Sequence, residues 1–206
     1  MPKTKSIYSV HPSVQLMRHW LETLEEKTGR SLDAWLALVK KSGPKTESER
    51  REWLKKEHGL GTNYASWIAG RAAGKETEFA DPQAYLKAAE GFVEQMFAGP
   101  KAALRPIYEE LLRVGLALGN DVKVCPCQTM VPLYRNHVFA QIKPTTRTRI
   151  DLGFALGARQ PEGRLIDTGG YAKKDRITHR IPIASSTDID AEVKRWLRLA
   201  YDGDSA

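Results

Sequence analysis

The 206-residue sequence contains few cysteines and no long apolar run. Its two cysteines, Cys125 and Cys127, stand one residue apart, a spacing that offers no disulfide framework. Nowhere do about 18 apolar residues follow one another, and residues 1–6 lead into no apolar stretch. We therefore expect a cytoplasmic protein without a membrane span, a secretory signal or a membrane partner. Its 41% hydrophobic residues suffice for one ordinary core or two small ones.

The sequence also lacks the short motifs of several enzyme classes. It contains no Gly-x-Ser-x-Gly sequence and no Walker-type phosphate loop, and the glycines of residues 165–171 are interpreted as a turn. A nuclease could hold Mg²⁺ with Asp151, Asp167 and Asp175, assisted by Lys173 and Lys174. No acid-x-Lys arrangement on a strand supports that interpretation. We favour a non-enzymatic protein with no catalytic residue, no cofactor and no bound metal.

Positive charge is in excess and is concentrated in one segment. The chain has 32 Lys and Arg against 25 Asp and Glu, which gives a net charge of +7. Residues 123–180 hold eleven of these cations and four of these acids, a difference that equals the whole net charge. Such a patch attracts phosphate groups, so nucleic acid is the first partner that the composition suggests. An ordinary solvated surface would have the same composition.

The first 75 residues predict four short helices. Apolar residues recur at helical spacing in four segments, residues 13–27, 32–42, 47–58 and 63–73. The expected helix caps are Ser13, Ser31, Thr46 and Thr62, and Thr46 has the capping-box partner Glu49. Each segment is associated with one tryptophan, and we interpret the four as a shared core: Trp20, Trp35, Trp53 and Trp67.

The third and fourth predicted helices are joined by residues 59–62, which contain two glycines. This length and turn chemistry are typical of a helix-turn-helix-like pair, in which residues 63–73 would contact DNA. Two short helices around a glycine turn also occur in domains that never touch DNA. The pair alone therefore leaves both interpretations open.

A polar segment after residue 74 separates the helical part from the rest of the chain. We predict a helical N-terminal domain of residues 1–75 and a second domain of residues 81–206. Asp81 and Pro82 are a helix-start signal, and residues 104–118 form another amphipathic pattern.

From residue 121 the apolar period changes from helical to alternating. Alternation predicts antiparallel strands near residues 122–125, 131–134, 138–143, 149–154 and 176–183, followed by a helix capped by Thr187. The whole chain is then of the α+β class, with a small all-helical N-terminal domain and an antiparallel meander sheet that is packed with helices on one side.

Two parts of the sequence resemble known families. Residues 20–35, 41–45 and 53–61 resemble an uncharacterised helical domain of unknown function that is common in bacteria. The second half, from Tyr108–Leu111 to Asp190–Lys194, is similar to another domain of unknown function. That domain also occurs in proteins labelled "predicted transport protein". The resemblance implies a two-domain architecture and no established activity, cofactor or catalytic residue.

Alternation assigns the side chains of the sheet to two faces. We expect the helices to cover Val138, Ala140, Ile142, Ile150, Leu152, Ile177 and Ile181. The opposite face then carries the candidate nucleic-acid-binding residues Gln141, Lys143, Arg147, Arg149, Arg176 and Arg180. Phe139, with Tyr134 or Tyr171, would lie among these charges and stack on bases.

Other classes of function stay open. A small-ligand or enzymatic pocket between sheet and helices would require convergence of Tyr134, His137, Asp151 and His179. A protein partner or a homo-oligomer would require an exposed apolar patch, for which we name Phe92, Met96 and Phe97. A zinc site would require His137 or His179 beside the two cysteines, and we expect none.

Overall fold

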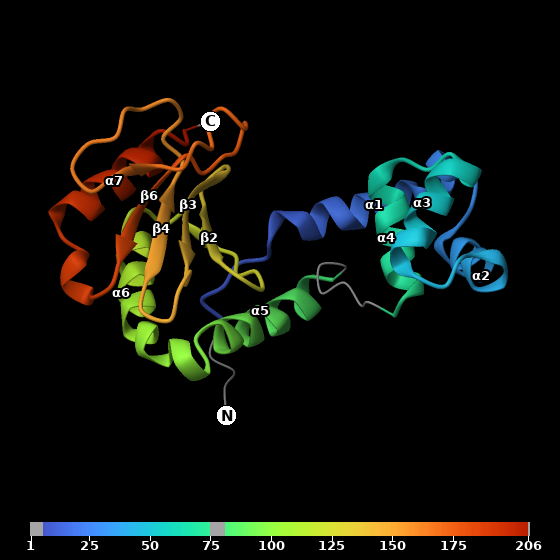
Figure 1. Ribbon diagram of the computed structural model, residues 1–206, viewed down its shortest axis with the longest axis horizontal. Helices are drawn as coiled ribbons and strands as arrows, with labels where there is room; N and C mark the ends of the chain where they lie inside the picture. Colours follow the sequence, from blue (N-terminus) through green and yellow to red (C-terminus); the bar gives the residue numbers. More distant parts are fainter. Residues whose placement is uncertain (1–5, 75–80, 206) are drawn as a thin grey trace. The chain divides into compact units, whose positions relative to one another are not determined.

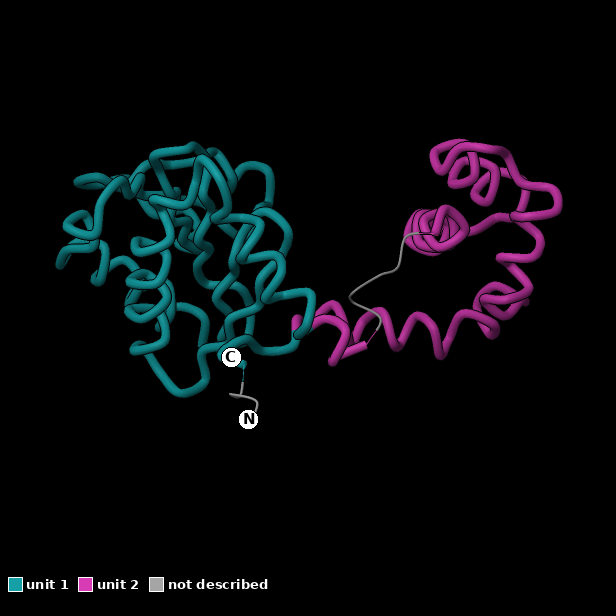
Figure 2. The backbone as a smooth tube through the Cα atoms, turned by 90° about the horizontal axis from the view of Figure 1, so that it is seen from below, with its two compact units in different colours: residues 1–10, 86–206 teal, residues 11–85 magenta. Residues whose placement is uncertain are grey.

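The structure is a computed structural model that describes residues 6–74 and 81–205 of the chain (Figure 1). The described residues form two compact units. We call residues 11–74 with 81–85 the first unit (magenta in Figure 2, where the key reads unit 2) and residues 6–10 with 86–205 the second unit (teal, unit 1 in the key). The polar segment expected between two domains lies largely outside the described residues. None of the described helices has both the length and the apolar character that crossing a membrane requires.

The first unit contains four helices, α1 (Pro12–Thr28), α2 (Leu32–Ser42), α3 (Glu47–His58) and α4 (Thr62–Ala72). The caps Ser31 and Thr46 are confirmed, the latter with the predicted Glu49 capping box. The predicted cap Ser13 is wrong, because His11 caps α1 by accepting a hydrogen bond from the Ser13 amide at 3.0 Å. Thr62 is the first helical residue, and Gly61 before it is the cap.

The core of the helical unit gathers residues of all four helices. It contains Leu24, Trp35, Val39, Leu54, Leu60, Ala65, Trp67, Ile68 and Ala69. Trp35 and Trp67 are therefore core residues, as predicted, and Trp53 packs against this core from a half-buried position. Trp20 is also half-buried, with its ring 5.9 Å from that of Tyr64.

Helices precede and follow the sheet of the second unit. Before the sheet are α5 (Pro82–Met96), the 3-10 helix η2 (Gly99–Leu104) and α6 (Arg105–Leu116); after it is α7 (Ala191–Asp202). Asp81 caps α5, as predicted, by accepting hydrogen bonds from the amides of Gln83 and Ala84. The predicted exposed apolar patch is wrong, because Phe92, Met96 and Phe97 are all buried within the chain.

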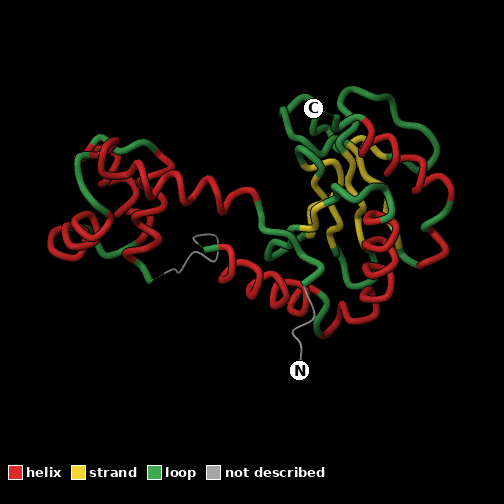
Figure 3. The backbone as a smooth tube through the Cα atoms, turned by 180° about the vertical axis from the view of Figure 1, so that it is seen from behind, coloured by secondary structure: helices red, strands yellow, loops and turns green. Residues whose placement is uncertain are grey.

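Six antiparallel strands form one sheet in the order β1-β2-β3-β4-β6-β5. Figure 3 shows the strands, in yellow, gathered in this unit. Their bounds are β1 (Lys123–Val124), β2 (Val131–Tyr134), β3 (Val138–Lys143), β4 (Ile150–Phe154), β5 (Ile166–Asp167) and β6 (His179–Ile183). One core joins α6 and α7 to the apolar side chains of the sheet. The chain is thus α+β, as predicted, although β5 is too short to show an alternating pattern.

A bulge between β2 and β3 changes which face each side chain occupies. Leu133 pairs with Ala140 and Tyr134 pairs with Val138, so Phe139 has no partner across the ladder. Phe139 and Ala140 are both fully buried, and the Phe139 ring lies 5.6 Å from that of Tyr201 on α7. The prediction that Phe139 lies among exposed charges is therefore wrong. Val138, predicted to face the core, is only half-buried.

Candidate functional site

The strand register places several predicted residues on the face of the sheet opposite α7. Gln141 pairs with Gly153 and Gly153 with Arg180, while Lys143 pairs with Asp151. These residues alternate with the fully buried Ile142, Leu152 and Ile181, so they point to the other face. Lys143 is exposed, and Gln141 and Arg180 are half-buried.

Ile177 lies on this outer face, not in the core as predicted. A Cβ atom at Gly153 would lie only 2.7 Å from Ile177 Cγ2 and 2.9 Å from Gln141 Cγ. Glycine is therefore required at this position, where Ile177 closes over the sheet. The predicted strand of residues 176–183 begins only at His179, which explains why Ile177 does not follow the alternation.

Asp151 forms ion pairs with two of the predicted cations. Its Oδ1 atom lies 3.0 Å from Arg149 Nε and 3.1 Å from Arg180 Nη1. The carboxylate is largely covered by these partners, whereas each arginine keeps about a third of its side chain exposed. The outer face therefore carries a mixed cluster of charge at Asp151, with an excess of one cation.

A cavity of about 680 Å³ opens at the end of the sheet where β3 leads into β4. Three cations from separate segments line it: Lys101 of η2, Lys143 at the end of β3 and Arg147 in the β3–β4 turn. The other described lining residues, Gln95, Met96, Ala98, Pro100, Gln128, Thr129, Pro144 and Thr145, include no acid. Lys101 Nζ donates to the Pro144 carbonyl at 2.5 Å, which holds the turn against η2. We call this the cationic cavity.

Arg176 lies at the opposite end of β3 from the cationic cavity. Its Nε donates to the carbonyl of Val138, the first residue of β3, at 3.0 Å, and its Nη2 pairs with Asp204. Lys143 is the last residue of the same strand, five residues away. At about 3.4 Å per residue the two strand ends are about 17 Å apart. The six basic or polar candidates on the sheet therefore do not form one continuous patch.

The predicted pocket of Tyr134, His137, Asp151 and His179 does not form. The His137 side chain contacts Asp204 at 3.1 Å beside the β2–β3 turn. Asp151 lies at the other end of β3, where it is the register partner of Lys143 across the β3–β4 ladder. His179 is buried on the inner side, where its ring contacts Thr178 Oγ1 and the Arg159 carbonyl. Burial raises the pKa of Tyr134 to about 12, so its hydroxyl stays protonated at neutral pH.

The cysteines and acidic residues do not gather into a reactive cluster. Cys125 and Cys127 are free, and burial raises the pKa of Cys125 to about 12. Asp167 accepts a hydrogen bond from the Gly169 amide, and β6 separates its strand from that of Asp151. Within residues 6–74 and 81–205, no three His, Cys, Asp or Glu side chains are placed to hold a metal ion.

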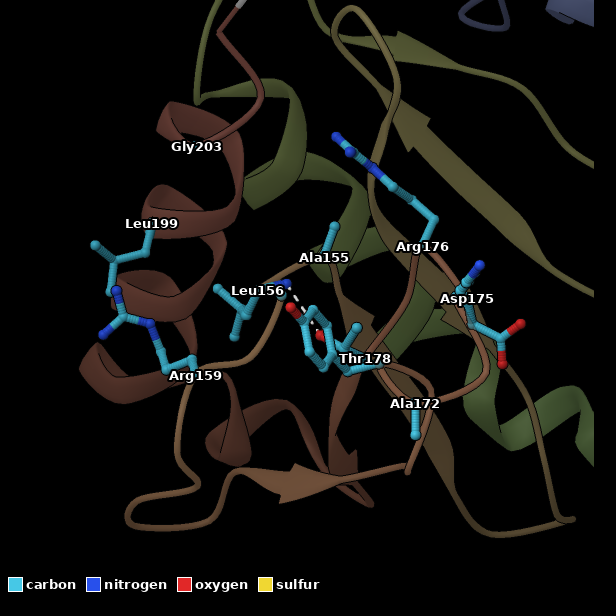
Figure 4. A pocket seen from close by; sticks show the side chains of 12 residues that line it. Ala155, Leu156, Arg159, Ala172, Asp175, Arg176, Thr178, Leu199 and Gly203 are labelled. Carbon is cyan, nitrogen blue, oxygen red and sulfur yellow. Dashed lines mark hydrogen bonds between the residues drawn. The ribbon is translucent and has the colours of Figure 1, made fainter.

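Asp204, for which no local sequence signal predicts a role, organises the end of the sheet opposite the cationic cavity. The residue is 2% exposed, and its carboxylate accepts hydrogen bonds from the amides of Asn136 and His137, from His137 Nδ1 and from Arg176. A second and larger cavity, of about 820 Å³, lies beside this cluster (Figure 4). Arg176 and Gly203 belong to its lining.

The architecture and these cavities define a two-domain α+β protein with positively charged concave surfaces in its second unit. Residues 93–203 match the family model described as Domain of unknown function (DUF5655), which covers more than half of the chain, so the chain belongs to this family. Residues 17–73 match a second model, described as Domain of unknown function (DUF4287). The predicted resemblance to two domains of unknown function is confirmed. No curated protein and no solved structure matches the chain.

Proposed function

We propose that the protein binds nucleic acid through phosphate contacts at the cationic cavity. The observation that carries the proposal is the convergence of Lys101, Lys143 and Arg147 on one concave surface without a lining acid. Two of these residues, Lys143 and Arg147, were predicted from the charge pattern. Arg149 and Arg180 extend the positive surface past Asp151, which offsets only one of them.

Phosphate contact is the mode of binding that this lining favours. Lys and Arg supply point charges and hydrogen-bond donors to phosphate oxygens, and such contacts carry affinity without reading the base sequence. No aromatic side chain is among the described lining residues, so base stacking contributes little at this cavity. We therefore expect binding to depend steeply on salt and weakly on sequence.

The helix-turn-helix-like pair contributes less to this proposal than the cavity does. Five of the eleven residues of α4 are buried: Ala65, Trp67, Ile68, Ala69 and Gly70. A recognition helix needs an exposed face that enters a groove. We therefore assign the main phosphate contacts to the second unit.

Fluorescence anisotropy of labelled duplex and single-stranded oligonucleotides tests this function. We expect the double substitution Lys143→Glu/Arg147→Glu to weaken binding at least tenfold, since two phosphate contacts become repulsive. The matched control is Lys123→Glu/Lys194→Glu, which changes the net charge equally at two exposed sites of the same unit outside the cavity.

Circular dichroism would establish that both double variants keep the fold. Equal losses of affinity in the two variants would show that net charge, not the cavity, attracts the oligonucleotide. The absence of binding by the unaltered protein at low salt would overturn the proposal.

A further inference from the structure

The second cavity, of about 820 Å³, is built from three segments of the second unit (Figure 4). One segment, residues 155–159, follows β4; another, residues 171–178, precedes β6; and α7 contributes Leu199, with Gly203 just beyond its end. Figure 4 shows Arg159 and Leu199 on one side of the cavity and Arg176 and Asp175 on the other. The volume is within the range of small-molecule sites, which is about 300–1,000 Å³.

A buried histidine fixes the segment that follows β4. His179 is 1% exposed, and its Nε2 lies 2.9 Å from the Arg159 carbonyl, which can only accept a hydrogen bond. The Nδ1 atom of the same ring lies 2.8 Å from Thr178 Oγ1, and that hydroxyl accepts from the Leu156 amide at 3.2 Å. This chain of hydrogen bonds holds the backbone at Leu156 and at Arg159.

Arg176 is held in place on the other side of the cavity. Its guanidinium donates from Nε to the Val138 carbonyl and from Nη2 to the buried Asp204 carboxylate. Among the described residues, no hydrogen-bond partner occupies its Nη1 group, which can donate to a ligand. An arginine that is positioned in advance loses little conformational entropy when it binds an oxyanion.

The lining combines positive charge with apolar surface. Arg159, Lys174 and Arg176 oppose a single lining acid, Asp175. The apolar part is formed by Ala155, Leu156, Ala172 and Leu199, and Tyr171 in the same lining is 60% exposed. An exposed tyrosine beside guanidinium groups suits a planar group that carries an anion. The cationic cavity described above has no such ring.

We propose that this second cavity binds a phosphate monoester that carries a planar ring, the chemistry of a mononucleotide. Arg159, Lys174 and Arg176 contact the phosphate, while Tyr171 and the apolar residues pack against the ring. The proposal does not rest on nucleic-acid binding at the cationic cavity, because the two cavities share no lining residue. Either site can therefore be present without the other.

Isothermal titration calorimetry of the full chain with adenosine 5′-monophosphate tests the proposal. We expect a dissociation constant below about 1 mM, with adenosine and ribose 5-phosphate each bound at least tenfold more weakly. No heat of binding at millimolar adenosine 5′-monophosphate would overturn it. If adenosine binds as tightly as adenosine 5′-monophosphate, the phosphate is not recognised. If ribose 5-phosphate binds as tightly, the ring is not recognised. Either result contradicts the proposal.

Neighbouring lysines provide a matched pair of variants. Lys174 lines the cavity and Lys173 does not, although both are exposed. We expect Lys174→Gln and Arg159→Gln each to weaken binding about tenfold and Lys173→Gln to leave it unchanged. Tyr171→Ala should weaken the binding of adenosine 5′-monophosphate more than the binding of ribose 5-phosphate. If Lys143→Gln in the cationic cavity abolishes binding and Lys174→Gln does not, the nucleotide occupies the other cavity and the proposal fails.

The same chemistry is presented by a free nucleotide and by the 5′ end of a nucleic-acid chain. A 5′-phosphorylated dinucleotide, compared with adenosine 5′-monophosphate in the same titration, distinguishes the two sources. Tighter binding of the dinucleotide assigns the cavity to a chain end, and tighter binding of the mononucleotide assigns it to a free ligand. Both results require loss of affinity in Lys174→Gln, and retention of affinity in that variant overturns the proposal.

Discussion

Asp204 holds together segments of the second unit that are far apart in the sequence. Its buried carboxylate binds the β2–β3 turn through the amides of Asn136 and His137 and binds the loop before β6 through Arg176. The Asp204 carbonyl also accepts from Asn136 Nδ2 at 2.9 Å. Because several donors converge on this carboxylate, it links the β2–β3 turn to the loop that lines the 820 Å³ cavity.

We predict that Asp204→Ala lowers the free energy of unfolding by about 1–3 kcal/mol, because buried donors lose their acceptor. Urea unfolding followed by circular dichroism measures the change. The control is Asp202→Ala, whose exposed carboxylate lies 3.7 Å from Arg198 and should contribute within about 0.5 kcal/mol. Equal stability of the two variants would contradict this role of Asp204.

The turn between α3 and α4 depends on the backbone freedom of Gly59. This residue ends α3 with φ of 65°, in the left-handed region, and its amide donates to the Leu54 carbonyl. No atom would meet a Cβ at this position within 4 Å, so any cost of a side chain comes from the backbone. The helical unit therefore offers a direct test of the turn.

We predict that Gly59→Ala destabilises the helical unit by about 1–2 kcal/mol, the cost of a left-handed residue that carries a Cβ. Gly59→Asn should cost less, because asparagine accepts this conformation more readily. Tryptophan fluorescence during urea unfolding reports on this unit, which contains four of the five tryptophans. Alanine and asparagine variants of equal stability would show that the turn is not strained.

Acid should loosen the connection between β6 and α7. Asp188 accepts from the amides of Ala184 and Ser185 at 2.8 and 2.9 Å, and these hydrogen bonds hold the pKa of its carboxyl below the ordinary 3.8. The unfolded chain therefore binds this proton more readily than the folded protein does. The carboxylate stabilises the fold at pH values above its ordinary pKa, and this stabilisation is lost as the pH falls through its lower pKa in the folded state.

We therefore predict that Asp188→Asn is less stable than the unaltered protein at neutral pH, and that the gap narrows between about pH 5 and pH 3. Urea midpoints measured across this range give the two curves. A gap of constant size down to the lowest pH would contradict the assignment to this carboxylate.

Elements with strong local signals were predictable from the sequence, and those without such signals were not. The Thr46–Glu49 capping box and the Asp81 cap follow from side chains within three residues of the amides that they bind. The bulge at Phe139 and the pairing of the two-residue β5 outside β6 depend on partners far along the chain. Phe139 is apolar and fits either face, so its burial became evident only from the register.

At the scale of the whole molecule, the residues of the cationic cavity were also predictable only in part. The density of positive charge identified Lys143 and Arg147. Lys101 lies 42 residues before Lys143, outside the basic segment. It joins the other two cations only because η2 packs against the β3–β4 turn. Arg149 and Arg180 were predicted as part of a basic sheet face, and their shared partner Asp151 was visible in the sequence only as one acid among several. Composition gives the sign of a surface, whereas the register determines which charges cancel.

The salt dependence of oligonucleotide affinity tests the central claim most directly. Three phosphate contacts at Lys101, Lys143 and Arg147 predict a slope of log affinity against log salt of about −2.7 on duplex DNA. In Lys143→Glu/Arg147→Glu the slope should become shallower by about 1.8, while the Lys123→Glu/Lys194→Glu control keeps the original slope. An unaltered slope in the cavity variant, or no binding at about 50 mM salt, would contradict phosphate binding at the cationic cavity.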